Sequence, residues 1–69
     1  MTYYQKAISE MPEASGYDPR HVEAFIRLEH STLGGLTAGR FKKEVKIAVA
    51  CIRAGGADAA ERCAKSFGL

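Results

Sequence analysis

The residues that could do chemistry are few and scattered along this sequence. The two cysteines stand as C-x11-C, at Cys51 and Cys63, without the C-x-x-C pair that structural zinc sites commonly use. The two histidines, His21 and His30, do not supply a compact second half-site. We therefore predict no metal site, and we interpret both cysteines as buried or half-buried thiols in the reduced state.

A serine, a histidine and an acid do occur together, because Ser31 follows His30 and Glu29. These are the residue types of an acyl-transfer triad, but a triad is defined by spatial geometry and needs an oxyanion pocket. A small domain rarely encloses a pocket of the size that small-molecule sites have. We predict no enzymatic activity, no cofactor and no small-molecule substrate.

The stretch "LGGLTAGR", residues 33 to 40, places three glycines near the start of a predicted helix. It lacks the preceding strand, the Gly-Lys-Ser/Thr ending and the G-x-G-x-x-G spacing of phosphate-binding loops. We interpret it as a flexible connection between two helices, with Leu33 and Leu36 placed on the core.

Positive charge gathers in the segment that follows this connection. Residues 37 to 56 hold five cations against Glu44 alone, whereas residues 1 to 36 hold three cations against five anions. The five cations are Arg40, Lys42, Lys43, Lys46 and Arg53. Such a face is consistent with simple solvation, with contact to nucleic acid or with contact to a protein partner.

In the nucleic-acid interpretation, Arg40 and Lys43 would read bases, while Lys42, Lys46 and Arg53 would contact phosphates. A small helical domain of this kind resembles a helix-turn-helix or excisionase-like protein. Three features count against it: a connection longer than the usual turn, no Asn or Gln on the basic helix, and a net charge of only +2.

In the protein-partner interpretation, tyrosine and arginine side chains serve as interface anchors. Ile47 and Cys51 widen the apolar surface of the basic helix to one side. The predicted partner-binding residues are Tyr17, Arg20, His21, Arg27, Arg40 and Lys43. We favour this interpretation and keep the DNA-binding one as the alternative.

Four helices must position these residues, at approximately 2–11, 19–30, 38–54 and 59–67. Thr2, Asp18 and Thr37 are the predicted N-caps of the first three, with proline at the first position of the second. Gly55 and Gly56 are expected to end the third helix. Asp58 and Glu61 are expected to form a capping box on the fourth.

Apolar residues recur at helical spacing in each predicted helix. The first helix carries Tyr3, Tyr4, Ala7, Ile8 and Met11, before Pro12 ends it and "EASGYD" forms a loop. The second carries Val22, Phe25, Ile26 and Leu28, with Arg20, Glu23, Arg27 and His30 outward. The third carries Phe41, Val45, Ala48, Val49 and Ile52, and the fourth carries Ala59, Ala60, Cys63, Ala64 and Phe67.

With 69 residues and no strand signal, the chain is predicted to be a single all-α domain over 1–69, a compact bundle of three to four short helices, with a helix-turn-helix-like arrangement as one form of it. No apolar run reaches the length of a membrane-spanning helix, and no signal peptide is evident. We expect a soluble, cytoplasmic protein.

Across "GYDPRHVEAFIRLEHSTLGGLTAGRFKKEVKIAVACIRAGG" and "AAERCAKSFGL" the sequence resembles small antiactivator-like regulatory proteins of proteobacterial integrative and conjugative elements. The resemblance rests on overall pattern and covers Gly16 to Leu69. It implies a regulator that holds conjugative transfer off by binding transcriptional activators, namely a LuxR-type quorum-sensing receptor and an activator with a helix-turn-helix-like domain. It implies no enzyme chemistry and no cofactor, and it assigns no binding residue.

Overall fold

The computed structural model describes residues 1–69 and contains four α-helices, two short helical turns and no strand. The α-helices are α1 (Tyr3–Ser9), α2 (Pro19–Glu29), α3 (Ala38–Cys51) and α4 (Ala57–Ser66). A 3-10 turn, η1 (Pro12–Ala14), precedes α2, and a π-type turn, η2 (Ile52–Gly56), joins α3 to α4. The predicted all-α fold class is confirmed.

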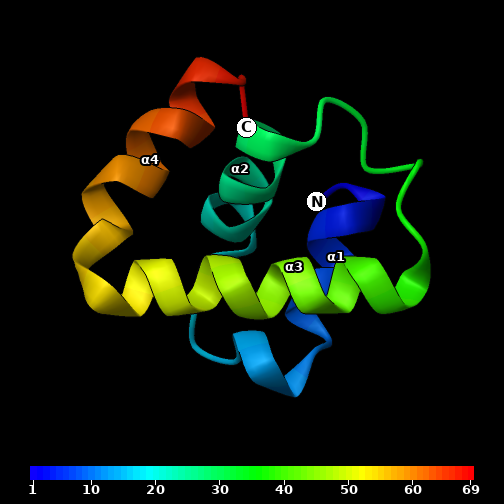
Figure 1. The fold of residues 1–69 in the computed structure, drawn as a ribbon. Helices are drawn as coiled ribbons and strands as arrows, with labels where there is room; N and C mark the ends of the chain where they lie inside the picture. Colours follow the sequence, from blue (N-terminus) through cyan, green and yellow to red (C-terminus); the bar gives the residue numbers. More distant parts are fainter.

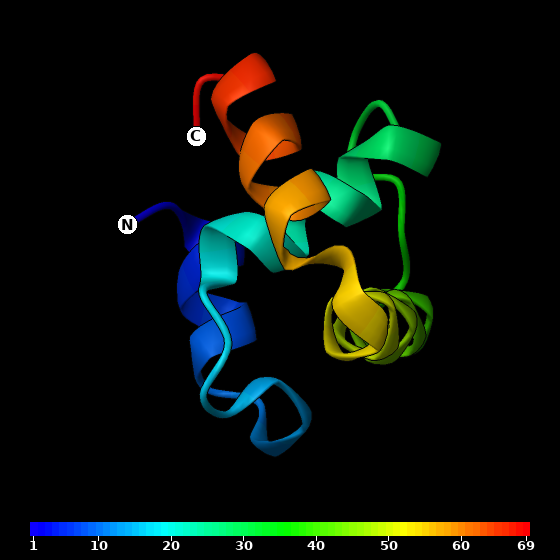
Figure 2. The same ribbon diagram turned by 90° about the vertical axis from the view of Figure 1, so that its left-hand side faces the viewer.

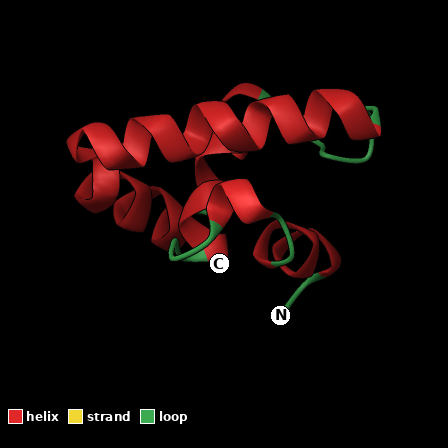
Figure 3. Ribbon diagram, turned by 90° about the horizontal axis from the view of Figure 1, so that it is seen from below, coloured by secondary structure: helices red, strands yellow, loops and turns green.

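Helix α3 is the longest helix; α2 and η1 pack against it, whereas α1 and α4 pack mainly against α2 (Figure 1). When α3 is seen end-on, α2 and α4 run across the view, so neither lies parallel to it (Figure 2). Both chain ends lie on the side away from α3, as the view from below also shows (Figure 3). No helix combines the length and the apolar character needed to cross a membrane.

Local side-chain caps fix the starts of the first three helices, as predicted. The Thr2 hydroxyl accepts a hydrogen bond from the Gln5 backbone N–H, and the Gln5 side-chain oxygen accepts one from the Thr2 backbone N–H, which completes a capping box. The Asp18 carboxylate accepts from the Arg20 backbone N–H at 2.9 Å, ahead of Pro19, and Thr37 accepts from Arg40 at 3.2 Å.

The predicted capping box on α4 is wrong. This helix begins at Ala57 with Gly56 as its N-cap and no side-chain cap, so Asp58 lies inside its first turn. The η2 turn decides this start: Gly55 takes φ 109°, a left-handed conformation that glycine tolerates. A β-carbon on Gly56 would lie 2.7 Å from the Cys51 carbonyl oxygen. The chain therefore changes direction at Gly55 and Gly56, and α4 begins at Ala57, one residue before Asp58.

Two other boundaries differ from the prediction. The first helix ends at Ser9 rather than Met11, and Pro12–Ala14 forms η1 where we expected a loop to begin. Regular α-helix in the third element stops at Cys51 and passes into the π-type turn η2. Proline is favoured at the start of η1, because its fixed φ is close to the helical value and a first helical position needs no N–H donor.

The core lies between α1, α2 and α3 and contains the predicted apolar stripe of α3. Val45, Ala48 and Val49 are buried, and Phe41 and Ile52 pack partly buried against them. The full core cluster comprises Ile8, Ala14, Val22, Ile26, Leu33, Val45, Ala48 and Val49. The connection prediction is also confirmed, because Leu33 is buried and Leu36 packs against this cluster.

Alanines make the contact between α2 and α4. Ala24 of α2 and both Ala60 and Ala64 of α4 are buried, so the two backbones approach closely. Small side chains permit this packing at low conformational cost, since alanine has no side-chain rotamer to fix. The predicted inner side of α4 is correct for these alanines.

Three large side chains predicted to face the core are exposed instead. Tyr3 is 79% exposed, Leu28 58% and Phe67 43%. Leu28 lies two residues beyond Ile26, which places it about 200° around the helix from that buried residue. Helical rotation therefore carries Leu28 off the core face, even though its neighbours are apolar.

Glu23, predicted to point outward, is 1% exposed. Its carboxylate accepts from Gln5 Nε2 at 2.9 Å and from Arg27 Nε at 2.8 Å. Buried charges persist in proteins when they are paired and hydrogen-bonded, and both conditions hold here. The Gln5–Glu23–Arg27 network thus links α1 to α2 and engages one of the predicted partner-binding arginines inside the fold.

Candidate functional site

The predicted partner-binding residues do not form one patch. Three of them stand at the start of α2, where Arg20 Nη2 lies 2.8 Å from Asp18 Oδ2 and His21 Nε2 lies 3.7 Å from the same oxygen. The hydrogen bond from Arg20 is the main reason that the pKa of Asp18 lies below its ordinary value. Arg20 and His21 therefore support the cap that begins α2.

Tyr17, the third residue of this group, is engaged with the far end of α3. Its hydroxyl accepts from Arg53 Nε at 3.0 Å, and the Arg53 guanidinium carbon lies 6.0 Å from the ring centroid. The hydrogen bond raises the pKa of Arg53 above its ordinary value. Tyr17 and Arg53, one from each predicted site, are thus each other's partners.

One side of α3 and of the η2 turn that continues it, which we call the basic flank, carries Lys42, Lys46 and Arg53, and η1 lies against it. Lys42 Nζ lies 3.6 Å from the Glu13 carboxylate of η1. The pKa of Glu13 is lowered first by its backbone hydrogen bond and then by Lys42 and Lys46. The charge that made this flank conspicuous in the sequence is therefore partly compensated in the fold.

The remaining two cations, Arg40 and Lys43, behave differently from each other. Arg40 Nε donates to Glu44 Oε1 at 3.1 Å, one helical turn further along α3. Lys43 is exposed and makes no ion pair. Lys46 makes no ion pair either, but it lowers the pKa of Glu13, whereas Lys43 has no such acidic neighbour among the ion pairs of the chain.

The opposite side of α3, which we call the groove flank, carries Glu44, Ile47 and Cys51 and faces α2. Between the two helices lies a groove of about 200 Å³ whose lining is mostly apolar. Its lining residues are Phe25, Ile26, Leu28, Glu29, Glu44, Ile47, Ala48 and Cys51. Leu28 and Ile47 are 58% and 48% exposed, so two aliphatic side chains from different helices stand open on this surface.

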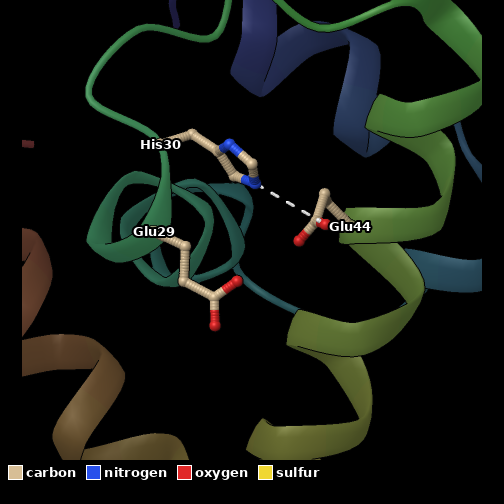
Figure 4. A group of neighbouring side chains, drawn as sticks. All are labelled: Glu29, His30 and Glu44. Carbon is tan, nitrogen blue, oxygen red and sulfur yellow. Dashed lines mark ion pairs between the residues drawn. The ribbon is translucent and has the colours of Figure 1, made fainter.

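A cluster of three polar side chains lies at the groove, from the end of α2 and the facing turn of α3. Figure 4 shows the His30 ring directed at the Glu44 carboxylate, with the Glu29 side chain below them, and one ligand atom of each residue lies within 4.8 Å of the other two. His30 Nε2 lies 3.6 Å from Glu44 Oε1; this nitrogen is buried and has no hydrogen-bond partner. Glu44 itself is 5% exposed, whereas Glu29 is on the surface.

A second hollow, of about 500 Å³, lies between α1, the connection before α3 and the first turns of α3. Tyr4, Leu36 and Phe41 line it, but they also pack against the buried core. Tyr3 is its one strongly exposed large apolar side chain. This hollow is larger than the α2–α3 groove, but most of its large apolar lining residues belong to the core or pack against it.

The prediction from sequence included two parts of the groove flank, Ile47 and Cys51, as a sideways extension of the apolar surface. Both are exposed and line the groove, so Cys51 is not the half-buried thiol that we expected, whereas Cys63 is partly buried. Leu28 and the Glu29–His30–Glu44 cluster were missed. The exposure of Leu28 could have been predicted from its angular offset from Ile26 on the helix. Nothing in the sequence indicated that His30 would lie close to Glu44.

Comparison of the chain with known protein families, with curated proteins and with solved structures finds no match.

Proposed function

We propose that this chain is a transcriptional antiactivator that binds an activator protein through the α2–α3 groove. The observation that carries the proposal is the pair Leu28 and Ile47, two exposed aliphatic side chains on opposite walls of one apolar groove. A contiguous patch of exposed apolar surface is typical of interaction sites. The sequence resemblance to antiactivators of integrative and conjugative elements supports the same function.

The occupant that best fits this groove is an amphipathic helix of the activator. Helix-in-groove recognition uses apolar anchors at helical spacing, which would contact Leu28 and Ile47. Lys43 lies one helical turn before Ile47 and has no acidic partner within the chain. An acidic residue flanking the apolar anchors of the occupant would complement it, with Arg40 at the same edge of α3.

The candidate activators are a LuxR-type quorum-sensing receptor and a helix-turn-helix-like activator that controls conjugative transfer. Sequestering either one would keep the mobile element from transferring. Of the six residues predicted as contacts, Arg40 and Lys43 adjoin the groove on α3. Tyr17, Arg20, His21 and Arg27 remain predicted contacts, but each also has a partner inside the fold.

Co-purification with each candidate activator tests the proposal. We expect a complex at micromolar concentration that Leu28→Ser and Ile47→Ser weaken, because both variants remove exposed apolar contacts without opening the core. Tyr3→Ser is the matched control, since it removes an exposed large side chain of the second hollow.

Three results would count against the proposal. One is the absence of any complex while the fold is intact. Another is loss of the complex in Tyr3→Ser alone. The third is a stable homodimer that Ile47→Ser converts to monomer, which would make a second copy of this chain the occupant.

The second candidate function is DNA binding through Arg40, Lys42, Lys43, Lys46 and Arg53. The free charge of Lys43 and the exposed Lys46 favour it. The connection between α2 and α3, residues 30–37, is longer than the turn of about 3–4 residues in a helix-turn-helix. A gel shift with DNA upstream of the chain's own operon, at two salt concentrations, separates the two functions, because phosphate contacts weaken steeply with salt.

A further inference from the structure

The Glu29–His30–Glu44 cluster has the chemistry of a metal site. One ligand atom from each residue lies within 4.8 Å of the other two. Imidazole nitrogen together with carboxylate oxygen is a ligand set that zinc and related divalent transition metals accept. We infer that these three side chains form a site for a divalent transition-metal ion such as Zn²⁺. The inference does not depend on the proposed function.

The distance between His30 and Glu44 fits two ligands of one bound ion. His30 Nε2 and Glu44 Oε1 are 3.6 Å apart, and no hydrogen bond joins them. Two ligand atoms of a tetrahedral zinc ion, each at about 2.1 Å from the metal, lie about 3.4 Å apart. The pair therefore already stands at nearly the separation that a shared metal ion requires.

The buried nitrogen of His30 is the second observation that points to a ligand. Buried polar atoms nearly always have a partner, and an orphaned one calls for an explanation such as an unseen ion. His30 Nε2 is the only buried side-chain nitrogen or oxygen without a hydrogen-bond partner in the chain, and Glu44 Oε1 lies 3.6 Å from it. Figure 4 shows this nitrogen facing the Glu44 carboxylate, with which a protonated imidazole forms an ion pair, and a metal ion between the two would take the place of that proton.

The third ligand, Glu29, is able to complete the site because it is exposed at the end of α2. A shift of about an ångström by this side chain would bring its carboxylate to ligand distance. Three protein ligands leave the remaining coordination positions to water or to a group from outside the chain. The ion would therefore sit at the surface end of the cluster.

Arg40 opposes this site, because its guanidinium is hydrogen-bonded to the same Glu44 oxygen at 3.1 Å. Like charges repel, so a divalent ion at Glu44 would have to displace Arg40, whose side chain is 57% exposed. The structure thus predicts opposite effects for two neighbours: removing the Glu29 charge weakens metal binding, and removing the Arg40 charge strengthens it.

Titration of the untagged protein with Zn²⁺, followed by calorimetry and by NMR of the imidazole signals, tests the inference. We expect one ion per chain and movement of the His30 signals, with those of His21 unchanged. His30→Gln should lower affinity at least about tenfold, because loss of an outer-shell partner of a ligand alone costs about that much. Glu29→Gln should also weaken binding, Arg40→Gln should tighten it, and His21→Gln is the matched control.

The cysteines provide the competing explanation, because thiolates also bind zinc. In the Cys51→Ser/Cys63→Ser double variant, the inference expects unchanged affinity. Loss of binding in that variant, equal affinity in His30→Gln, or no saturable binding by the wild-type chain would each overturn it. Circular dichroism verifies the fold, and Glu29→Gln, at an exposed position, gives a ligand variant that does not disturb the core.

Discussion

The two flanks of α3 present different surfaces although they belong to one helix and share one buried stripe. On the basic flank, Lys42 and Arg53 each contact a group brought by the preceding chain, Glu13 and Tyr17. On the groove flank, Ile47 stands exposed opposite Leu28 of α2. Charge alone would make the basic flank the functional one, but the fold compensates part of that charge and leaves the aliphatic surface of the groove uncovered.

The largest expected effect comes from the stripe that supports both flanks. Val45→Ala should lower the free energy of unfolding by about 2 kcal/mol, because it removes two methyl groups from a fully buried position and leaves a cavity. Urea unfolding followed by circular dichroism measures this loss. An unchanged free energy of unfolding in this variant would show that Val45 is not packed in the core beneath the two flanks.

The comparison is sharpest at two adjacent residues on opposite flanks. Ile47→Ser should weaken the complex with the activator about tenfold, the loss typical of an interface anchor, whereas Lys46→Ser should change affinity less than about twofold. Both side chains are exposed, so neither change should alter unfolding by more than about 0.5 kcal/mol. Calorimetric titration of the two variants measures the contrast, and a reversed order of effects would assign binding to the basic flank.

DNA binding offers a direct way to break the comparison. We expect binding no tighter than about micromolar at physiological salt, the range of non-specific contacts, with no preference for the chain's own upstream DNA. Replacing Lys42, Lys43 and Lys46 by alanine should reduce this weak affinity equally on all sequences. Fluorescence anisotropy with specific and unrelated duplexes measures it. Nanomolar, sequence-selective binding that the triple variant abolishes would favour the alternative function.

The smallest expected effect concerns the compensation of the basic flank itself. Lys42→Ala should raise the pKa of Glu13 only part of the way to its ordinary value, since the backbone hydrogen bond that lowers it most is retained. A lowered carboxyl pKa stabilises the fold above the ordinary pKa, and this contribution is lost as pH falls through the folded value. NMR titration of the Glu13 side-chain carbon measures the shift. An unchanged pKa would show that Lys42 does not compensate Glu13.

The helices and most of their starts could be predicted from sequence, because caps and helical periodicity are local. Thr2, Asp18 and Thr37 act on N–H groups two or three residues away. The start of α4 could not be predicted in this way, because the reversal at Gly55 and Gly56 sets it. The burial of Glu23 depends on Gln5 from another helix, so helical rotation alone assigned it wrongly.

The candidate site depends on contacts between elements, which sequence spacing does not reveal. Helical spacing placed Ile47 and Cys51 beside the main apolar stripe of the third helix, but it gave no indication that α2 would bring Leu28 opposite them. Arg53 and Tyr17 are separated by 36 residues and meet only because η1 and α2 pack beside the end of α3. The sequence shows that positive charge gathers in residues 37 to 56, but it does not show that Glu13 and Tyr17 would contact two of these cations.

Mapping the activator's contact on the chain tests the central claim most directly. Amide chemical shifts of the isotopically labelled protein should change at Leu28, Ile47 and Cys51 when an activator is added, and stay in place at Lys42, Lys46 and Arg53. Changes confined to the basic flank, with the groove residues unmoved, would contradict the account.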